Sequence, residues 1–302
     1  MKVGLMGGTG FVGASLLNQL VAKGYKIVLL TRDKKKAIHL ESQTIQVVQW
    51  QADDLDSWKE SIEGCDAIIN LAGEGIAAKR WTKQQKEKIK TSRIQSTRSL
   101  VRVIESLKQK PPVLVNASAI GYYGDVPEGD VTESHPKGES YLSDVCEGWE
   151  KEAEKAQDFG VRVVMLRIGI VLGKKGGALK RMLPPFQFFI GGPLGTGKQW
   201  FPWVHRDDVI GAILFSLTNE KVEGRVNMTA PESLRMKEFC HVLGKVLHRP
   251  SSLPVPTFAL KLLAGDMSEM LITGQKVVPK KLQEYGYTFK YPQCEEALRA
   301  IL

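Results

Sequence analysis

The sequence has few cysteines and no cysteine pair with metal-ligand spacing. Cys65, Cys146, Cys240 and Cys294 are scattered over 302 residues, and the five histidines form no ligand pattern. We therefore expect reduced thiols and no metal site. No apolar run approaches the length of a membrane span. An apolar strand that begins at Lys2 leaves no room for a signal peptide, so the expected compartment is the cytoplasm.

The sequence also lacks a nucleic-acid recognition motif, although its net charge is +9. Many of the cations lie between Lys79 and Lys110, where acids are few and no interleaved aromatic platform accompanies them. A solvated helix face explains this stretch, and an anionic cofactor or substrate explains part of the excess charge. We expect a small-molecule substrate and neither nucleic acid nor membrane as a partner. The oligomeric state, monomer or homodimer, stays open.

Apolar strand patterns alternate with helical patterns through the first half of the chain. The clearest helical pattern runs from Lys83 to Leu107, and Pro111 and Pro112 end it. This alternation implies a parallel sheet with helices on both faces. The predicted fold class is α/β, a Rossmann-type doubly wound sheet. After the first strand, the predicted strands are Lys26–Thr31, Ile45–Trp50, Ala67–Leu71, Val113–Ala117 and Val161–Leu166.

The alternation breaks after Gly169, and a segment rich in glycine, proline and aromatic residues follows at 173–205. A long segment of this kind is typical of a lid or pocket wall. We assign 1–172, with elements from about 206–228, to a Rossmann domain. Residues 173–205 and 229–302 are assigned to a smaller substrate-binding lobe. Trp200 and Trp203 are candidates for stacking on a substrate, and core packing is the competing interpretation. Asp207 or Asp208 is expected to cap the helix that follows.

A glycine array stands between the first strand and the first helix. Gly7 supplies a conformation that a β-carbon forbids, Gly10 allows close approach to a diphosphate, and Gly13 allows tight packing of helix and strand. An ordinary glycine turn is the competing interpretation, but the position before a helix favours a dinucleotide site. The predicted cofactor contacts here are Gly7, Thr9, Gly10, Phe11, Val12 and Gly13.

The end of the second strand bears on which dinucleotide binds. Arg32 can pair with a 2′-phosphate and Thr31 can donate a further hydrogen bond, which favours NADP. Asp33 is the competing signal for NAD, because an acid in this region accepts from the ribose 2′-hydroxyl. After the fourth strand, the small residues of Leu71-Ala72-Gly73 leave room for the cofactor, although an ordinary turn explains them too.

Several motifs give the chain a family resemblance. They are GGTGFVG (7–13), NLAGEGIAAKRW (70–81), KIKTSR (88–93), SAIGYYG (118–124), CEGWE (146–150), LRIGIVLGKKGGAL (166–179), MLPPF (182–186), GGPLGTGKQWFPWVH (191–205) and GQKVVPKKL (274–282). The chain resembles the extended short-chain dehydrogenases/reductases, and within them the atypical NAD(P)-dependent nucleotide-sugar epimerase-like group with a C-terminal cap. The resemblance implies cofactor contacts at Thr31, Arg32, Leu71, Ala72, Arg93, Gly169, Ile170 and Val171. For Arg93, one more cation on a basic helix is the competing interpretation.

Active members of that superfamily carry a Tyr and a Lys four residues apart on one helix, and this sequence lacks the pair. Val145 stands four residues after Tyr141, and an alignment on Glu150 gives Leu142 and Cys146 instead. The i, i+4 spacing matters because it places the ammonium beside the phenol and lowers its pKa. The remaining candidates for proton transfer or substrate orientation are Ser118, Tyr122, Tyr123 and Tyr141. A structural hydroxyl at the strand end is the competing interpretation of Ser118. For Tyr122 and Tyr123, the alternative is that one packs inward and the other donates a hydrogen bond to a loop.

Two functions follow from these patterns. One is an NADP-dependent oxidoreductase or epimerase that acts on a nucleotide sugar or a related small hydroxyl or carbonyl substrate. The other is a non-catalytic NADP-binding protein that reports redox state to a partner. The aromatic segment favours the first, and the missing Tyr–Lys pair favours the second.

Overall fold

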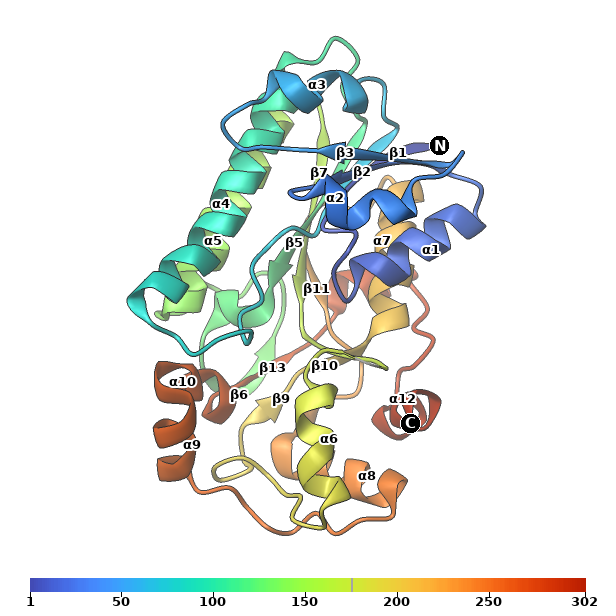
Figure 1. Cartoon of the computed structure of the whole chain (residues 1–302). Coiled ribbons are helices and arrows are strands. Elements are labelled where there is room, and N and C mark those ends of the chain that lie inside the picture. The colour runs from blue at the N-terminus through green and yellow to red at the C-terminus, as the bar shows by residue number, and fades with distance from the viewer. Residues whose placement is uncertain (175) are drawn as a thin grey trace.

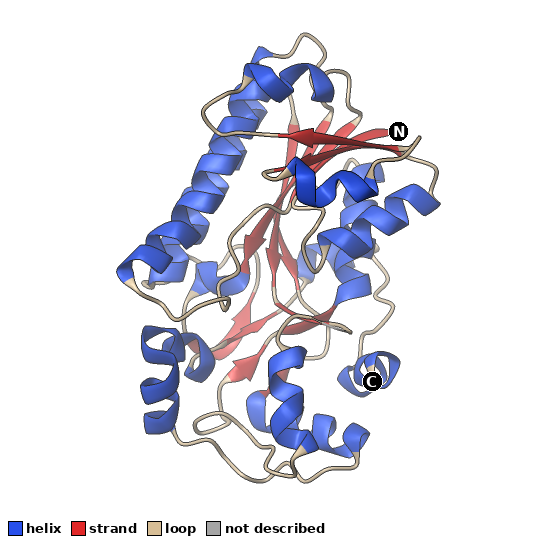
Figure 2. Ribbon diagram, viewed as in Figure 1, coloured by secondary structure: helices blue, strands red, loops and turns tan. Residues whose placement is uncertain are grey.

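The computed structural model describes residues 1–174 and 176–302, and a sheet of seven parallel strands forms its centre (Figures 1 and 2). The strand order is β11-β7-β5-β4-β1-β2-β3. The order reverses between β1 and β4, which is where such sheets bind ligands at the carboxyl ends of their strands. The strands are β1 (Lys2–Met6), β2 (Lys26–Thr31), β3 (Ile45–Gln49), β4 (Ala67–Asn70), β5 (Val113–Ala119), β7 (Arg162–Ile168) and β11 (Gly224–Met228).

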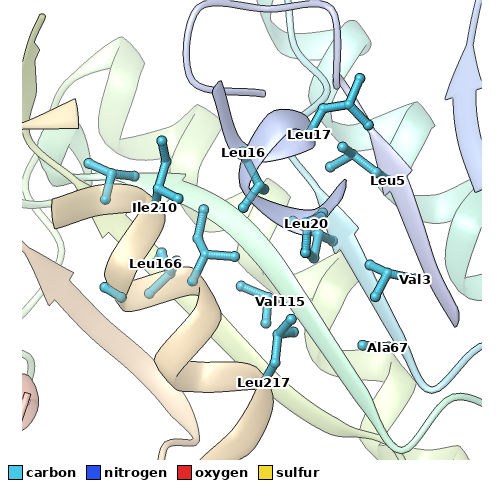
Figure 3. Packing of buried hydrophobic residues seen from close by; sticks show 14 of the residues in the cluster. Val3, Leu5, Leu16, Leu17, Leu20, Ala67, Val115, Leu166, Ile210 and Leu217 are labelled. Atoms are coloured by element: carbon cyan, nitrogen blue, oxygen red, sulfur yellow. The ribbon is translucent and has the colours of Figure 1, made fainter. Parts of the chain in front are cut away.

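Each predicted strand is present, and the fold class is confirmed as α/β of Rossmann type. The strands are nearly continuous apolar runs because helices cover both faces of the sheet. One face packs against α1 (Gly13–Ala22) and α7 (Arg206–Thr218), as the side chains of Leu16, Leu20 and Ile210 around Val115 show (Figure 3). The other face packs against α3 (Asp56–Ile62), α4 (Lys83–Ser106) and α5 (Tyr141–Glu154).

Helix α4 confirms the clearest helical pattern of the sequence. Its hydroxyl cap is Thr82, whose Oγ1 accepts from the Gln85 N–H at 3.1 Å. Leu100 and Ile104 are fully buried against the sheet. Between β2 and β3 lie the short helix α2 (Lys34–Ala37) and the 3-10 turn η1 (Ile38–Leu40), and η2 (Ile120–Tyr123) follows β5 directly.

A smaller lobe lies beyond the carboxyl ends of the central strands, at the lower end in Figure 1. Its core includes Phe186, Phe201, Trp203, Phe239 and Leu298. Its elements are β6 (Val126–Val131), β8 (Ile170–Leu172), α6 (Leu179–Gln187), β9 (Trp200–Phe201), β10 (Trp203–His205), β12 (Leu234–Arg235), α8 (Met236–Leu247), α9 (Thr257–Ala264), α10 (Glu269–Ile272), β13 (Gln275–Val277) and α12 (Cys294–Ile301), with the 3-10 turn η4 (Gly265–Ser268) before α10.

Two details differ from the sequence-based expectations. Helix α7 is capped by His205, whose Nδ1 accepts from the Asp207 N–H at 3.0 Å, so the predicted aspartate cap is wrong. Asp208 is instead fully buried and accepts from the Lys290 and Tyr291 N–H groups at 2.6 and 3.0 Å. These bonds hold the segment after α11 (Lys280–Glu284) against the Rossmann core. None of the helices described is long and apolar enough to cross a membrane.

Candidate functional site

The glycine array forms a tight turn that only glycine fits. Gly7 has φ +78°, and a β-carbon there would lie 2.6 Å from the backbone carbonyl of Leu71 in the neighbouring turn. A β-carbon on Gly13 would overlap the Gly7 carbonyl oxygen. The Gly10 N–H closes the turn onto the same oxygen at 3.0 Å. The glycine turn after β1 therefore packs closely against the turn after β4, at the point where the strand order reverses. We call the surface formed by these two turns the cradle.

Helix α1 begins in this cradle without a side-chain cap. Its first residue follows Val12, whose side chain makes no capping bond, and its first turn contains no acidic residue. The Ala14 N–H donates to the Gly10 carbonyl at 2.9 Å, so the N–H groups that precede it and the positive end of the helix dipole are available to an anion. Thr9 and Gly10 are exposed at the mouth of the turn. These features fit a diphosphate.

After β2, the acidic residue Asp33 and the basic residue Arg32 have separate roles. The Asp33 carboxylate caps α2 by accepting from the Lys36 N–H at 3.2 Å, and it pairs with the Lys36 ammonium at 3.1 Å. These contacts lower the pKa of Asp33. The Thr31 hydroxyl accepts from the Asp33 N–H at 3.3 Å and so stabilises the turn. Arg32 is exposed and makes no ion pair within the described part of the chain.

The β4 turn is held by a buried amide. Asn70 donates to the Thr97 hydroxyl at 2.9 Å and to Asn116 Oδ1 at 2.7 Å, and its own oxygen accepts from the Ala72 N–H at 3.1 Å. Because every polar atom of this amide is engaged, the turn from Leu71 to Gly73 is fixed beside the glycine array.

Arg93 lies against this turn. A β-carbon on Gly73 would be 3.1 Å from its guanidinium carbon, and the guanidinium stands 5.2 Å from the Trp149 ring centroid. The only hydrogen bond of the Arg93 side chain among the described residues is to the Ile89 carbonyl, at 3.0 Å. Burial lowers the pKa of Arg93, and the part of the chain that the structure describes offers it no carboxylate within ion-pair distance. A half-buried, uncompensated cation beside the cradle fits an anionic ligand.

Gly169, Ile170 and Val171 join the sheet to the lobe at the end of β7. The Gly169 N–H donates to the Met228 carbonyl at 3.0 Å, and the Ile170 N–H donates to the Pro202 carbonyl at 2.8 Å. Val171 packs against the same apolar cluster as Val12 and Leu71. The structure therefore brings the predicted segments of the cofactor site to one edge of the sheet.

Two of the catalytic candidates belong to a buried polar network. The Ser118 hydroxyl donates to Glu150 Oε1 at 2.6 Å, and Arg167 donates twice to the Glu150 carboxylate at 2.8 Å. The Tyr123 hydroxyl donates to Asn227 Oδ1 at 2.5 Å and accepts from Arg167 Nη1 at 2.9 Å. Burial raises the pKa of Tyr123 to about 12. Their hydroxyls therefore stabilise the fold and are not free to meet a substrate.

The two other tyrosines differ in their surroundings. The Tyr141 hydroxyl donates to the Lys86 carbonyl at 2.5 Å, and burial raises its pKa to about 12. Tyr122 is half-buried, and its hydroxyl has no hydrogen-bond partner among the described residues. Its ring centroid lies 3.5 Å from the Arg167 guanidinium carbon. Tyr122 is the candidate whose hydroxyl remains available for proton transfer.

On helix α5, Leu142 and Cys146 face the end of β5. A β-carbon on Gly121 in η2 would be 3.2 Å from Leu142 Cβ and 3.9 Å from Cys146 Sγ. These two residues thus occupy the i, i+4 positions on this face of the helix. Burial raises the pKa of the Cys146 thiol to about 12, so the thiol stays neutral at physiological pH. Neither side chain of this pair supplies the positive charge that a lysine would.

The two tryptophans of the lobe also differ. Trp203 is fully buried in the lobe core. A ring without exposed surface cannot stack on a ligand, so Trp203 is not kept as a substrate contact. Trp200 is partly exposed, donates to the Pro127 carbonyl at 3.0 Å and has the Arg235 guanidinium 4.1 Å from its ring centroid.

Comparison with known proteins identifies the family. A family profile described as NAD dependent epimerase/dehydratase family matches residues 3–228. The chain belongs to this family. A second profile, described as a domain of unknown function (DUF1731), matches residues 255–301 of this epimerase/dehydratase family member, within the predicted cap. The resemblance inferred from the motifs is therefore confirmed.

Relatives in this epimerase/dehydratase family match over nearly the whole chain. A protein of Arabidopsis thaliana named as a chloroplastic homologue of epimerase family protein SDR39U1 is 45% identical, with 100% of this chain and 87% of the relative covered. Epimerase family protein YfhF of Bacillus subtilis is 38% identical, with 100% and 98% covered.

Solved structures extend the comparison. The crystal structure of human epimerase family protein SDR39U1 with NADPH has a TM-score of 0.88 and 32% identity, with 100% of this chain and 99% of that chain covered. UDP-glucuronic acid 4-epimerase from Bacillus cereus, in complex with UDP-glucuronic acid and NAD, has a TM-score of 0.79 at 18% identity, with 99% and 97% covered. The second likeness shows the fold alone.

Sequence reasoning missed one feature of this epimerase/dehydratase site. The Phe11 ring packs against the glycine-rich segment after β8, where a β-carbon on Gly173 or Gly177 would lie 2.9 Å from the ring. The Arg206 guanidinium carbon is 5.5 Å from the same ring centroid, and its buried Nε has no hydrogen-bond partner in the described residues, with Asp207 Oδ1 3.8 Å away. No local pattern links residues so far apart in sequence. The glycines of 173–177 were the available signal, because close approach of another chain segment requires them.

Proposed function

We propose that the protein binds NADP(H) in the glycine cradle and acts as an oxidoreductase or epimerase on a small hydroxyl or carbonyl substrate such as a nucleotide sugar. The observation that carries the cofactor choice is the division of roles between Arg32 and Asp33. The acid that would serve NAD is engaged in capping α2. The neighbouring arginine has no ion pair in the described chain and can meet a 2′-phosphate.

The other cofactor contacts follow from the geometry of the cradle. The uncapped start of α1 and the turn at Gly7, Gly10 and Gly13 fit the diphosphate. Arg93 supplies a half-buried positive charge beside the β4 turn. That the related human protein was solved with NADPH supports the same assignment.

When bound, the nicotinamide supplies or accepts a hydride at the carbonyl or hydroxyl carbon of a substrate. The chain itself must orient that substrate and exchange a proton with its oxygen. Because Ser118, Tyr123 and Tyr141 donate their hydroxyl protons to protein acceptors, we assign the proton exchange to Tyr122. A phenol can serve in this way when it is within hydrogen-bond reach of the substrate oxygen.

A matched pair of neighbouring tyrosines tests the assignment. Stereospecifically deuterated NADPH is incubated with candidate nucleotide sugars and carbonyl compounds, and deuterium in the product is measured by mass spectrometry. We expect transfer with the native protein and about a hundredfold slower transfer with Tyr122→Phe. Tyr123→Phe should keep the transfer rate but lower the free energy of unfolding by about 1–3 kcal/mol, because a buried hydrogen-bond network loses a member.

The second candidate function is a non-catalytic NADP-binding redox sensor. The engagement of three of the four candidate hydroxyls in the fold favours it, as does the Leu142–Cys146 pair on α5. Tight NADPH binding without deuterium transfer to any substrate would support the sensor and reject the enzyme. The cytoplasmic location and the monomeric or homodimeric state remain predictions.

A further inference from the structure

The lower end of the lobe exposes a group of large apolar side chains. We call this group the apolar tip, and its exposed fractions range from 52% at Leu253 to 76% at Phe258. Such side chains are normally scattered singly on a soluble protein, and a group of them marks an interaction site. The apolar tip consists of Phe188, Phe189, Ile190, Leu253, Phe258, Leu262 and Leu263.

Three segments of the lobe supply the apolar tip, and two of them run side by side. The Leu253 N–H donates to the Gly191 carbonyl at 3.3 Å, and the Val255 N–H donates to the Pro193 carbonyl at 2.9 Å. Helix α9 follows directly and carries the other three side chains. Both α6, which ends beside Phe188, and α9 lie at the same end of the molecule (Figure 1). The fold therefore brings segments that are far apart in sequence to one end of the molecule (Figure 1).

The backbone holds one phenyl ring of the apolar tip outward in an uncommon conformation. Phe189 has φ +64°, a region that bulky residues rarely adopt. Its ring is 56% exposed, and the Arg249 guanidinium carbon lies 4.5 Å from the ring centroid. An apolar ring beside a cation at a protruding turn presents both groups to the same external surface.

The segments that supply the apolar tip carry cations and no acid, and the first acid after α9, Asp266, pairs with Lys86 at 2.5 Å. The sequence contains no Asp or Glu from residue 159 to residue 206, and none from 239 to 265. Lys245 pairs with Glu295 at 2.7 Å, but several other cations of these stretches have no ion pair within the described chain. They include Lys180, Arg181, Lys198, Arg249 and Lys261.

We propose that the apolar tip docks the protein on an anionic lipid surface. Apolar side chains would enter the interface between headgroups and acyl chains, and the surrounding cations would pair with lipid phosphates. A second copy of the chain fits less well, because two cationic rims would face each other. The proposed lipid contact differs from the expectation of no membrane partner. That expectation rested only on apolar runs long enough to span a membrane and on motifs along the chain.

Vesicle sedimentation tests the proposal with the full-length protein. The probe is phosphatidylcholine vesicles that contain about 30% phosphatidylglycerol, with pure phosphatidylcholine vesicles for comparison. We expect binding to the anionic vesicles that weakens as salt is added. The double variant Phe188→Ser/Leu262→Ser should bind them about tenfold more weakly. Ile38→Ser is the matched control, because this side chain is 48% exposed on η1, outside the apolar tip.

Three results would overturn the proposal. The first is no binding to anionic vesicles by the native protein. The second is unchanged binding by the double variant while its thermal midpoint equals that of the native protein. The third is a dimer, detected by light scattering, that the double substitution dissociates while vesicle binding stays unchanged. This result would assign the apolar tip to contact with a second copy of the chain.

Discussion

Asp33 and Arg32 carry opposite charges at adjacent positions, and only the aspartate is engaged in ion pairing within the described chain. The aspartate accepts from the Lys36 N–H and pairs with the Lys36 ammonium. Its carboxylate is therefore committed to the start of α2. The arginine is exposed beside the carboxyl end of β2, where a 2′-phosphate would lie in a Rossmann site. This arrangement links a local capping preference to cofactor choice.

Substitution of Arg32 tests that link. Arg32→Ala should weaken NADPH about 10- to 100-fold, as expected for loss of charge-assisted hydrogen bonds to phosphate, and should leave NADH nearly unchanged. Fluorescence titration of both nucleotides measures the effect, with Lys23→Ala after α1 as a control for loss of one exposed charge. An equal loss for both nucleotides would mean that Arg32 does not meet a 2′-phosphate.

His205 makes stability depend on pH. Burial lowers the pKa of this imidazole to about 4 from 6.5, and its Nδ1 accepts from the Asp207 N–H at the start of α7. The folded protein holds the neutral ring, so the unfolded chain binds more protons below pH 6.5. Stability should fall by about 2 kcal/mol between about pH 7 and pH 5 from this residue alone.

Urea denaturation of His205→Gln at both pH values checks this expectation. Glutamine retains an oxygen that can accept from the helix N–H but does not titrate, so the variant should lose that part of the pH dependence. The same slope in variant and native protein would contradict a neutral, buried imidazole.

Strands and helices were predicted well because their signals are local. The period of apolar residues defined β2 and α4, and the position of the glycines defined the turn before α1. Roles that depend on distant partners were not predictable. Trp203 and Tyr123 have the residue types of a binding site, but the fold buries both. The contact of Phe11 with the glycines after β8 likewise joins segments that no sequence window contains.

Helix α1 and the strand before it act as one unit through the glycine turn. A β-carbon on Gly13 would overlap the Gly7 carbonyl oxygen, so the helix could not begin where it does. Movement of the helix would carry Phe11 away from the segment that leads into α6. The glycine turn therefore positions both the diphosphate cradle and one edge of the lobe.

Gly13→Ala should weaken NADPH and NADH together, by about tenfold or more, because both nucleotides share the diphosphate. The paired comparison with Arg32→Ala separates the two parts of the site: one variant affects both nucleotides and the other affects NADPH alone. Isothermal titration measures the affinities, and circular dichroism verifies that the variant is folded. Unchanged affinity for both nucleotides in a folded Gly13→Ala variant would show that the cradle does not bind the diphosphate.

Taken together, the sheet, the lobe and the loops between them form a nucleotide site whose cofactor contacts are better defined than its proton donor. The cradle and Arg93 lie at the strand-order reversal, and Arg32 follows β2, the strand next to β1. Three hydroxyls that could have served in catalysis instead stabilise the fold. Membership in the NAD-dependent epimerase/dehydratase family is consistent with turnover, and cofactor binding is the property on which both candidate functions depend.

Direct titration of the native protein with NADPH and NADH tests the cofactor assignment. We expect saturable NADPH binding at micromolar concentration or below, with NADH at least about tenfold weaker, and a thermal midpoint that rises with NADPH concentration. No binding of NADPH in this range, or preference for NADH, would contradict it.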